Sequence, residues 1–178
     1  MIGLSSFLLE LMTFIFPLVF FSAGLYMAAF KKQKGGRALA VMGGLMLLLM
    51  GTRYINQTRN HIFLSNLSAA RVAHIEVGGA IIDDADEIEL IVGALNDRSW
   101  FSSNHGGWAK TVPLVILMRD GEARRFRAGY YLRQEGAVIE FTREWLGGQW
   151  RDGYAFSERL PVVLKEMGVM LPSEDRAN

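Results

Sequence analysis

The sequence contains no cysteine among its 178 residues. This absence excludes a disulfide scaffold, a thiolate metal site and a cysteine nucleophile. Patterns for other chemistry are also missing: there is no His-x-x-x-His or Asp-rich metal pattern, no G-x-S-x-G nucleophile elbow and no phosphate-binding glycine loop. The sequence therefore predicts no metal and no cofactor, and it favours binding or assembly over catalysis.

Charge is scarce in the first third of the chain and concentrated in the rest. Glu10 is the only formal charge before Lys31, the segment Lys31–Arg37 carries four basic residues, and 32 of the 37 charges lie from Arg53 onward. This last part has a net charge of −2, with 15 basic and 17 acidic residues. A near-neutral polar part has no excess of positive charge for phosphates, so we expect no nucleic-acid partner.

Two apolar runs, residues 7–30 and 35–55, predict a pair of transmembrane helices. They are 24 and 21 residues long, and a bilayer core requires roughly 20 apolar residues in a helix. The short connection between them forces an antiparallel hairpin. The alternatives are a cleaved signal peptide for the first run and a membrane-surface helix for the second. Nothing basic precedes the first run, and the second has no polar face.

The basic turn at residues 31–37 predicts the orientation of this hairpin. Basic residues in short loops stay in the cytoplasm, so both termini and the following domain should lie outside it. We expect a multi-pass protein of the inner (plasma) membrane with a periplasmic domain, in contact with membrane lipid. Small residues at helical spacing should let the two helices pack closely, unless they only reflect the abundance of Gly and Ala in spans: Gly24, Ala28, Ala40, Gly44 and Gly51.

The remainder predicts a tether or short helix at residues 56–70, an α+β domain at 71–172 and a polar tail at 173–178. Apolar alternation predicts a strand at 72–77, continuing through 80–82, and a run that is apolar on both faces predicts a central strand at 112–118. The turns Asp120-Gly121 and Glu135-Gly136 separate two further predicted strands, at 122–131 and 137–142. Asp84 and Ser157 are placed to start two amphipathic helices, whose apolar stripes are Ile88, Ile91, Val92 and Leu95, and Leu160, Val163, Leu164 and Met167. The predicted order is β-α-β-β-β-α, an antiparallel meander with both helices on one face.

All four tryptophans lie in stretches that the sequence predicts to be connections. Trp100 and Trp108 share one connection, and Trp145 and Trp150 share the other. Large rings in loops are typical of interfaces with a partner or with lipid headgroups. The alternative is that some of these rings cover a small core.

Arg125 and Arg127 should point to the same face of a strand, because strand side chains alternate. They are candidates for contact with anionic headgroups or with an acidic partner. The alternative is a solvated sheet face on which arginines pair with Glu122, Glu140 and Glu144.

These observations predict a non-enzymatic accessory or assembly subunit of a larger membrane complex. Its partners would be membrane proteins or further copies of this chain, bound through the spans and the tryptophan-bearing loops. Two other classes stay open: a membrane-tethered sensor that uses the aromatic loops as a pocket, and a membrane-tethered enzyme centred on His105 with an acidic partner.

Overall fold

The computed structural model describes residues 4–101, 110–131, 135–145 and 148–172. The chain divides into two compact units, Met1–Ile55 and Asn56–Asn178. One long helix contributes residues to both, and each unit is considered by itself below.

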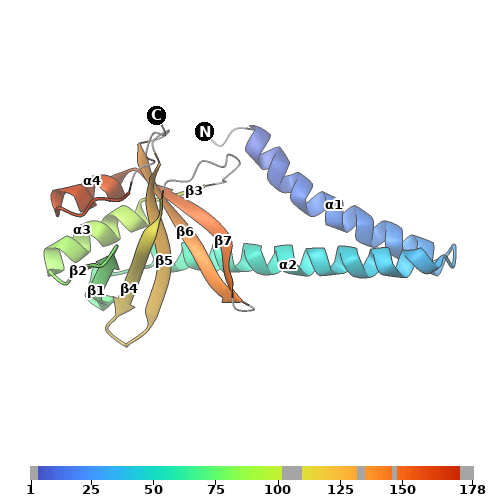
Figure 1. Ribbon diagram of the computed structural model, residues 1–178, viewed down its shortest axis with the longest axis horizontal. Helices are drawn as coiled ribbons and strands as arrows, with labels where there is room; N and C mark the ends of the chain where they lie inside the picture. Colours follow the sequence, from blue (N-terminus) through green and yellow to red (C-terminus); the bar gives the residue numbers. More distant parts are fainter. Residues whose placement is uncertain (1–3, 102–109, 132–134, 146–147, 173–178) are drawn as a thin grey trace. The chain divides into compact units, whose positions relative to one another are not determined.

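The first unit consists of helix α1 (Leu4–Ala29) and the first part of helix α2 (Lys34–Ser65). The two helices run antiparallel, because Gly24 lies against Ala40 while Gly36 lies against Ala28 (Figure 1). A side chain at Gly24 would overlap the backbone of Ala40, and one at Gly43 would overlap that of Phe21. Glycine at these positions lets the two backbones touch.

Apolar side chains of this unit point outward. Leu18, Leu45 and Leu48 are more than half exposed. Within the described residues one helix, Gly35–Ser65, is long and apolar enough to cross a membrane; the mean hydropathy of its most apolar 18-residue window is 1.6, and 11% of that window is buried. The apolar stretch Ile15–Ala29 in α1 is shorter.

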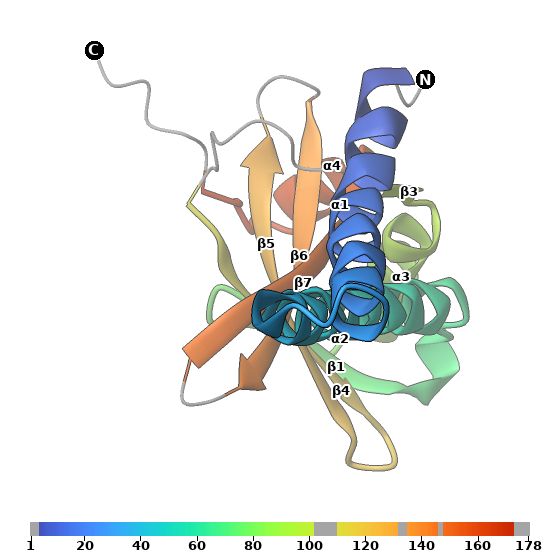
Figure 2. The same cartoon turned by 90° about the vertical axis from the view of Figure 1, so that its right-hand side faces the viewer.

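The described part of the second unit is built on one seven-stranded sheet in which neighbouring strands pair antiparallel. Its strand order is β2-β1-β4-β5-β6-β7-β3, and Figure 2 shows its strong twist. The strands are β1 (Val72–Val77), β2 (Ala80–Ile82), β3 (Ser99–Trp100), β4 (Val112–Met118), β5 (Ala123–Tyr131), β6 (Gly136–Trp145) and β7 (Gly148–Ser157). A short 3-10 turn (Ala69–Arg71) and helices α3 (Ala85–Asn96) and α4 (Arg159–Glu166) complete the unit. The expected α+β class with an antiparallel sheet is confirmed.

One face of the sheet, here called the first face, carries the main core. Ile116, Phe126, Ile139 and other inward side chains form a single buried cluster with the apolar stripes of α3 and α4, and both helices lie on this face (Figure 1). Leu64 and Leu67, at the end of α2 and just beyond it, belong to the same cluster. The segment expected as a tether or short helix therefore packs into the domain.

Local signals place both helices where the sequence predicts them. Asp84 Oδ1 accepts hydrogen bonds from the backbone N–H groups of Asp86 and Glu87, at 3.0 and 3.1 Å. Ser157 Oγ accepts from Leu160 N at 3.1 Å and donates to Ala94 O at 2.7 Å, so one buried hydroxyl joins the start of α4 to α3. These contacts satisfy N–H groups that a helix leaves without an internal partner.

The expected strand order was incomplete. The segment after residue 142 is not a connection: β6 extends to Trp145 and returns as β7, which pairs with β6 over its length. Residues 80–82 form a separate strand after a Gly78-Gly79 turn, and Ser99–Trp100 adds a short strand beside β7. The meander therefore has four long strands, β4 to β7, where the sequence predicted three.

Candidate functional site: the second face of the sheet

The face opposite α3 and α4, here called the second face, is polar on β5, whereas on β6 and β7 it carries a small buried apolar cluster of Val138, Tyr154 and Phe156. On β4 and β5 the first-face residues Leu114, Ile116 and Phe126 are buried, whereas Val115 and Arg127 between them are partly exposed and Arg125 is exposed. Strand pairing places Arg127 beside Glu140 of β6, and Glu140 beside Tyr154 of β7. Residues from several strands therefore meet on one surface.

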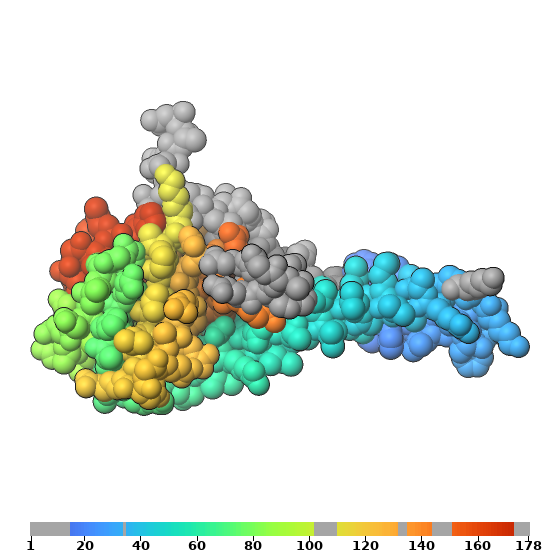
Figure 3. All heavy atoms as spheres, turned by 60° about the horizontal axis from the view of Figure 1, so that its bottom comes forward, coloured from blue at the N-terminus to red at the C-terminus, as the bar shows by residue number. Residues whose placement is uncertain are grey.

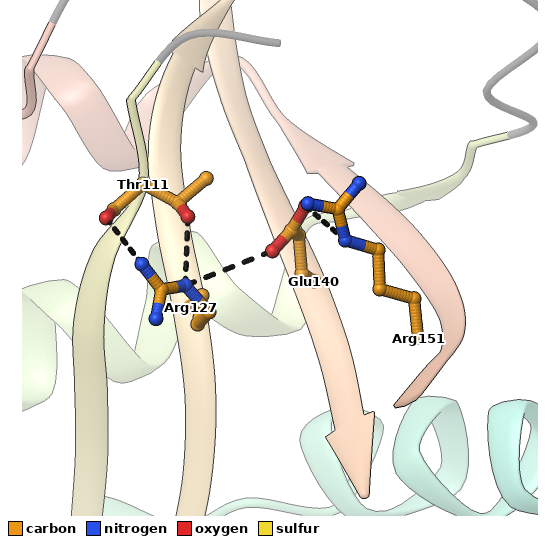
Figure 4. A network of polar contacts seen from close by, with 4 residues as sticks. All are labelled: Thr111, Arg127, Glu140 and Arg151. Atoms are coloured by element: carbon orange, nitrogen blue, oxygen red, sulfur yellow. Dashed lines mark hydrogen bonds and ion pairs between the residues drawn. The ribbon is translucent and has the colours of Figure 1, made fainter. Parts of the chain in front are cut away.

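A line of polar contacts crosses this face through Thr111, Arg127, Glu140 and Arg151 (Figure 4). Arg127 donates from Nε to Thr111 Oγ1 and from Nη2 to Thr111 O, both at 2.8 Å. Its Nε lies 3.8 Å from Glu140 Oε2, and Arg151 Nε lies 3.5 Å from Glu140 Oε1. One carboxylate therefore lies between two guanidinium groups.

Glu140 is almost completely buried, with 1% of its surface exposed. Neither carboxylate oxygen has a hydrogen-bond partner among the described residues, so its polar contacts with them are the two ion pairs. Burying a carboxylate is costly unless it is paired. The ion pairs with Arg127 and Arg151 offset part of that cost, and they keep both guanidinium groups close to the carboxylate.

The two guanidinium groups remain accessible. The side chain of Arg127 is 36% exposed and that of Arg151 is 54% exposed. Arg127 Nη1 makes no hydrogen bond or ion pair with the described residues. The planar guanidinium of Arg127, held through Nε and Nη2, can therefore offer its Nη1 donors to a carboxylate or phosphate.

The predicted residues Arg125 and Arg127 do lie on the same face, but their surroundings differ. Arg125 is exposed and Arg127 contacts Thr111 and Glu140. The Arg127–Glu140 contact was one of the pairings considered from the sequence, and Glu122 pairs with Arg124 instead, at 2.6 Å. Arg124 belongs to the first face, where its guanidinium lies 4.9 Å from the ring centroid of Phe63.

A second buried carboxylate, Asp152, lies at an irregularity between β6 and β7. Phe141 pairs with Gly153 and Thr142 pairs with Arg151, which leaves Asp152 as an extra residue on β7. Such a bulge redirects side chains. Asp152 accepts from Asn56 Nδ2 at 3.2 Å and lies 3.4 Å from Arg143 Nη2, while Arg151 reaches Glu140.

Trp100 covers a buried histidine of α2. Its ring stacks on that of His61 with 3.8 Å between centroids, and 44% of Trp100 stays exposed. His61 Nε2 lies 3.2 Å from Tyr154 O. Because a carbonyl oxygen only accepts, Nε2 is the ring nitrogen that carries the hydrogen and donates it. Burial, together with the nearby Arg98 cation, lowers the pKa of His61 to about 4, against the hydrogen bond to Tyr154. His61 is therefore neutral near pH 7.

The other tryptophans correct the expected loop placement. Trp145 ends β6 and Trp150 lies in β7, so both belong to strands of one hairpin. Their side chains lie outside the described part of the structure, as do Trp108 and His105 altogether. Of the four predicted interface rings, the structure describes the surroundings of Trp100 alone.

The predicted helix-packing residues separate into two groups. Gly24, Ala28 and Ala40 lie at the contact between α1 and α2, together with Gly36 and Gly43, which the spacing argument did not include. Gly44 faces the ring of Phe21 at 3.3 Å, whereas Gly51 has nothing within 4 Å of where a side chain would begin.

A shallow groove of about 270 Å³ lies between the end of α2 and the β4–β5 hairpin. Figure 3 shows the hairpin in yellow beside the end of α2 in teal. Its lining includes the apolar side chains of Ile62, Phe63 and Met118 and the Arg124–Glu122 ion pair. This lining offers packing surface without a reacting group.

Within the described ranges no group of three or more His, Asp or Glu side chains is placed to hold a metal ion. No protein-family model matches the chain, and neither the curated proteins nor the solved structures include a significant match to it.

The sequence argument missed Glu140 and Arg151 as a connected pair and did not consider His61 or Asp152. A signal for Glu140 does exist: it is a single carboxylate within the apolar run Ala137–Phe141. A charge in a strand that is apolar on both sides is expected to have a cation nearby.

Proposed function

We propose that this protein is a non-enzymatic accessory subunit of a membrane complex. A two-helix hairpin anchors it, and the domain outside the cytoplasm binds a partner protein. The observation that carries the anchor is the outward-facing apolar surface of the first unit, where Phe20, Leu25 and Leu45 are 44%, 48% and 58% exposed. Water would oppose such exposure, whereas lipid or a membrane partner would cover it.

The proposal includes a second span. Helix α1 has 26 residues, enough for about 39 Å at 1.5 Å per residue, which exceeds a hydrocarbon core of about 30 Å. Its backbone contact with α2 through Gly24 and Ala40 is a geometry that suits lipid, where close packing replaces the hydrophobic effect between helices. The basic turn would then lie in the cytoplasm, with the second unit on the opposite side.

The second face of the sheet supports the binding role. The first face is covered by α3, α4 and the end of α2. The second face carries exposed arginines beside the buried carboxylate of Glu140. A protein that needed this carboxylate only for stability would gain as much from an apolar side chain. The free-energy cost of burying the Glu140 carboxylate is consistent with a surface that binds another molecule.

Site-specific photocrosslinking in intact cells tests this function. A photoreactive residue at Arg125, exposed on the second face, should give discrete crosslinked products with another protein. The matched control is Glu89, an exposed residue of α3 on the other side of the sheet. Products that are identical for both positions, or absent from both, would contradict a partner-binding second face.

A further inference from the structure

The short strand β3 (Ser99–Trp100) is the outermost strand on one side of the sheet. Both of its residues are exposed, and they pair with Phe156 and Ala155 of β7. Two residue pairs supply few backbone hydrogen bonds, and a segment with so few contacts opens easily unless side chains hold it. Residues 98–101, which contain β3, are here called the strap.

Three side chains of the strap hold it in place. Arg98 donates from Nη2 to the backbone oxygen of His61 in α2. The ring of Trp100 stacks on the ring of His61, with 3.8 Å between centroids. Phe101 stacks on Phe156 of the second face, with 5.6 Å between centroids. Two of these three contacts are made with His61, so the strap depends on the state of that residue.

The ring of His61 is enclosed between the strap and the sheet. Only 6% of the residue is exposed. Trp100 covers one face of the ring, and Phe141 of β6 lies perpendicular to it with 5.1 Å between centroids. Nε2 donates to Tyr154 O. A neutral imidazole has one N–H group, so this hydrogen bond satisfies its donor.

Protonation changes what this enclosed ring requires. It adds a positive charge and an N–H group at Nδ1, which makes no hydrogen bond with the described residues. Burial opposes the charge, and so does the nearby cation of Arg98. The hydrogen bond to Tyr154 O and the ring face of Trp100 favour the cation. Burial and Arg98 outweigh the hydrogen bond, which places the pKa of His61 at about 4.

Among the described residues, no carboxylate contacts the ring of His61 to balance its charge. Asp152 of β7 lies 3.4 Å from Arg143, and Asp97, next to the strap, lies 3.8 Å from Arg159. Further ionisable groups on the elements around the ring are Arg59 of α2, Glu140 of β6, and Arg151 and Tyr154 of β7. The charged group that acts on the ring is therefore the repelling Arg98.

Release of the strap removes this conflict. It separates His61 from Arg98 and gives water access to Nδ1. It also leaves the outer edge of β7 at Ala155 and Phe156 without a neighbouring strand. An uncovered strand edge presents backbone N–H and C=O groups with which an extended segment of another chain can pair.

We propose that the strap is a pH-sensitive latch, which opens when His61 is protonated and uncovers the outer edge of β7. The proposal is independent of the proposed function, because it requires neither a membrane nor a partner. The closed state binds the proton less tightly than the open state, so the ratio of open to closed molecules rises as pH falls from 6.5 to 4. Below pH 4 both states are protonated and the ratio levels off.

Hydrogen exchange of the full chain in dodecyl maltoside micelles tests the latch. The protein and His61→Gln are compared at each pH, so the intrinsic exchange rates cancel. Between pH 7.5 and 5, protection of peptides containing residues 99–100 and 155–156 should fall roughly thirtyfold relative to the variant, which does not titrate. Parallel profiles for the two proteins would overturn the proposal.

A second variant and a control keep this test specific. Trp100→Ala removes the cover of His61 and should leave the edge of β7 poorly protected at every pH. His74→Gln, a histidine of β1 that makes no contact with the strap, should keep the pH profile of the protein. The centres of β4 and β5 should stay far better protected than the edge of β7 throughout. Equal protection of all these strands would mean that the whole domain opens, and would overturn a local latch.

NMR titration of the His61 ring in the same micelles measures the direction of the coupling. A pKa near 4 is expected, because the closed strap excludes the cation. A pKa above 6.5 would mean that the stacked rings stabilise the cation, so that acid closes the strap instead of opening it. That result would overturn the proposal even if exchange depended on pH.

Discussion

At the scale of single residues, three of the buried side chains described in the second unit carry a carboxylate or an imidazole, and each is compensated in a different way. Glu140 lies between two arginines, Asp152 has an amide and an arginine, and His61 stays neutral beneath Trp100. Each arrangement avoids leaving a buried charge without compensation. Each carboxylate has one partner across the β6–β7 hairpin, Arg151 for Glu140 and Arg143 for Asp152. The other partners come from other strands or helices, so sequence spacing does not reveal these sets.

His61 makes stability depend on pH. Its pKa falls from 6.5 in the unfolded chain to about 4 in the fold because burial penalises the cation. Between these values the unfolded state binds more protons, so stability is fully present above pH 6.5 and is lost as pH falls toward 4. We expect His61 to account for a loss of about 3 kcal/mol by pH 4, from the shift of about 2.5 pKa units.

Thermal melting of the full chain at a series of pH values measures this effect. Carboxylates also titrate in this range, so the informative quantity is the difference between the protein and His61→Gln, which retains a side-chain N–H but does not titrate. The stability advantage of His61 over Gln should shrink as pH is lowered from 6.5 to 4. Parallel pH profiles would show that His61 does not carry the dependence.

At the scale of helices and strands, continuous apolar segments were informative and irregular segments were not. The strand predicted at 112–118 agrees with β4, whose sequence is apolar on both faces and which lies between β1 and β5. In β7 every residue from Asp152 to Ser157 is buried, and the bulge at Asp152 shifts the register, so no alternation marks this strand. The Asp152-Gly153 pair, typical of a turn, further obscures it.

The two apolar helical stripes permit a test of the assigned packing. Ile91 and Leu164 are completely buried, and truncating either to Ala should destabilise the fold by roughly 2–5 kcal/mol, because a cavity replaces the lost side chain. Neighbouring residues provide controls: Leu90 is 47% exposed and Val162 is 58% exposed, so their Ala variants should change stability by less than about 0.5 kcal/mol. Chemical denaturation of the full chain gives the four values, and equal losses within either pair would refute the assigned helix face.

At the scale of the whole molecule, the boundary between the two units coincides with a change that the sequence shows, whereas the contacts of the candidate site do not follow from the sequence. The division between Ile55 and Asn56 falls where the second apolar run ends, because hydrophobicity and charge change together there. The charged network on the second face depends on strand pairing between β5, β6 and β7, and β7 was not predicted. Without that strand, Arg151 had no assigned position beside Glu140.

The proposed orientation rests on the four basic residues of Lys31–Arg37, which are harder to translocate than the nearly uncharged segment before them. The chain has no cysteine, so a single introduced cysteine is the only residue of the protein that a maleimide can label as a thiol. In intact spheroplasts, an impermeant maleimide should label cysteine at Ser5 and at the exposed Glu89, and should label cysteine at the exposed Gln33 only after permeabilisation. Labelling of Gln33→Cys alone would reverse the orientation. Labelling of Glu89→Cys with protection of both Ser5→Cys and Gln33→Cys would mean that α2 crosses the membrane and α1 does not, which removes the two-span anchor while leaving the domain outside.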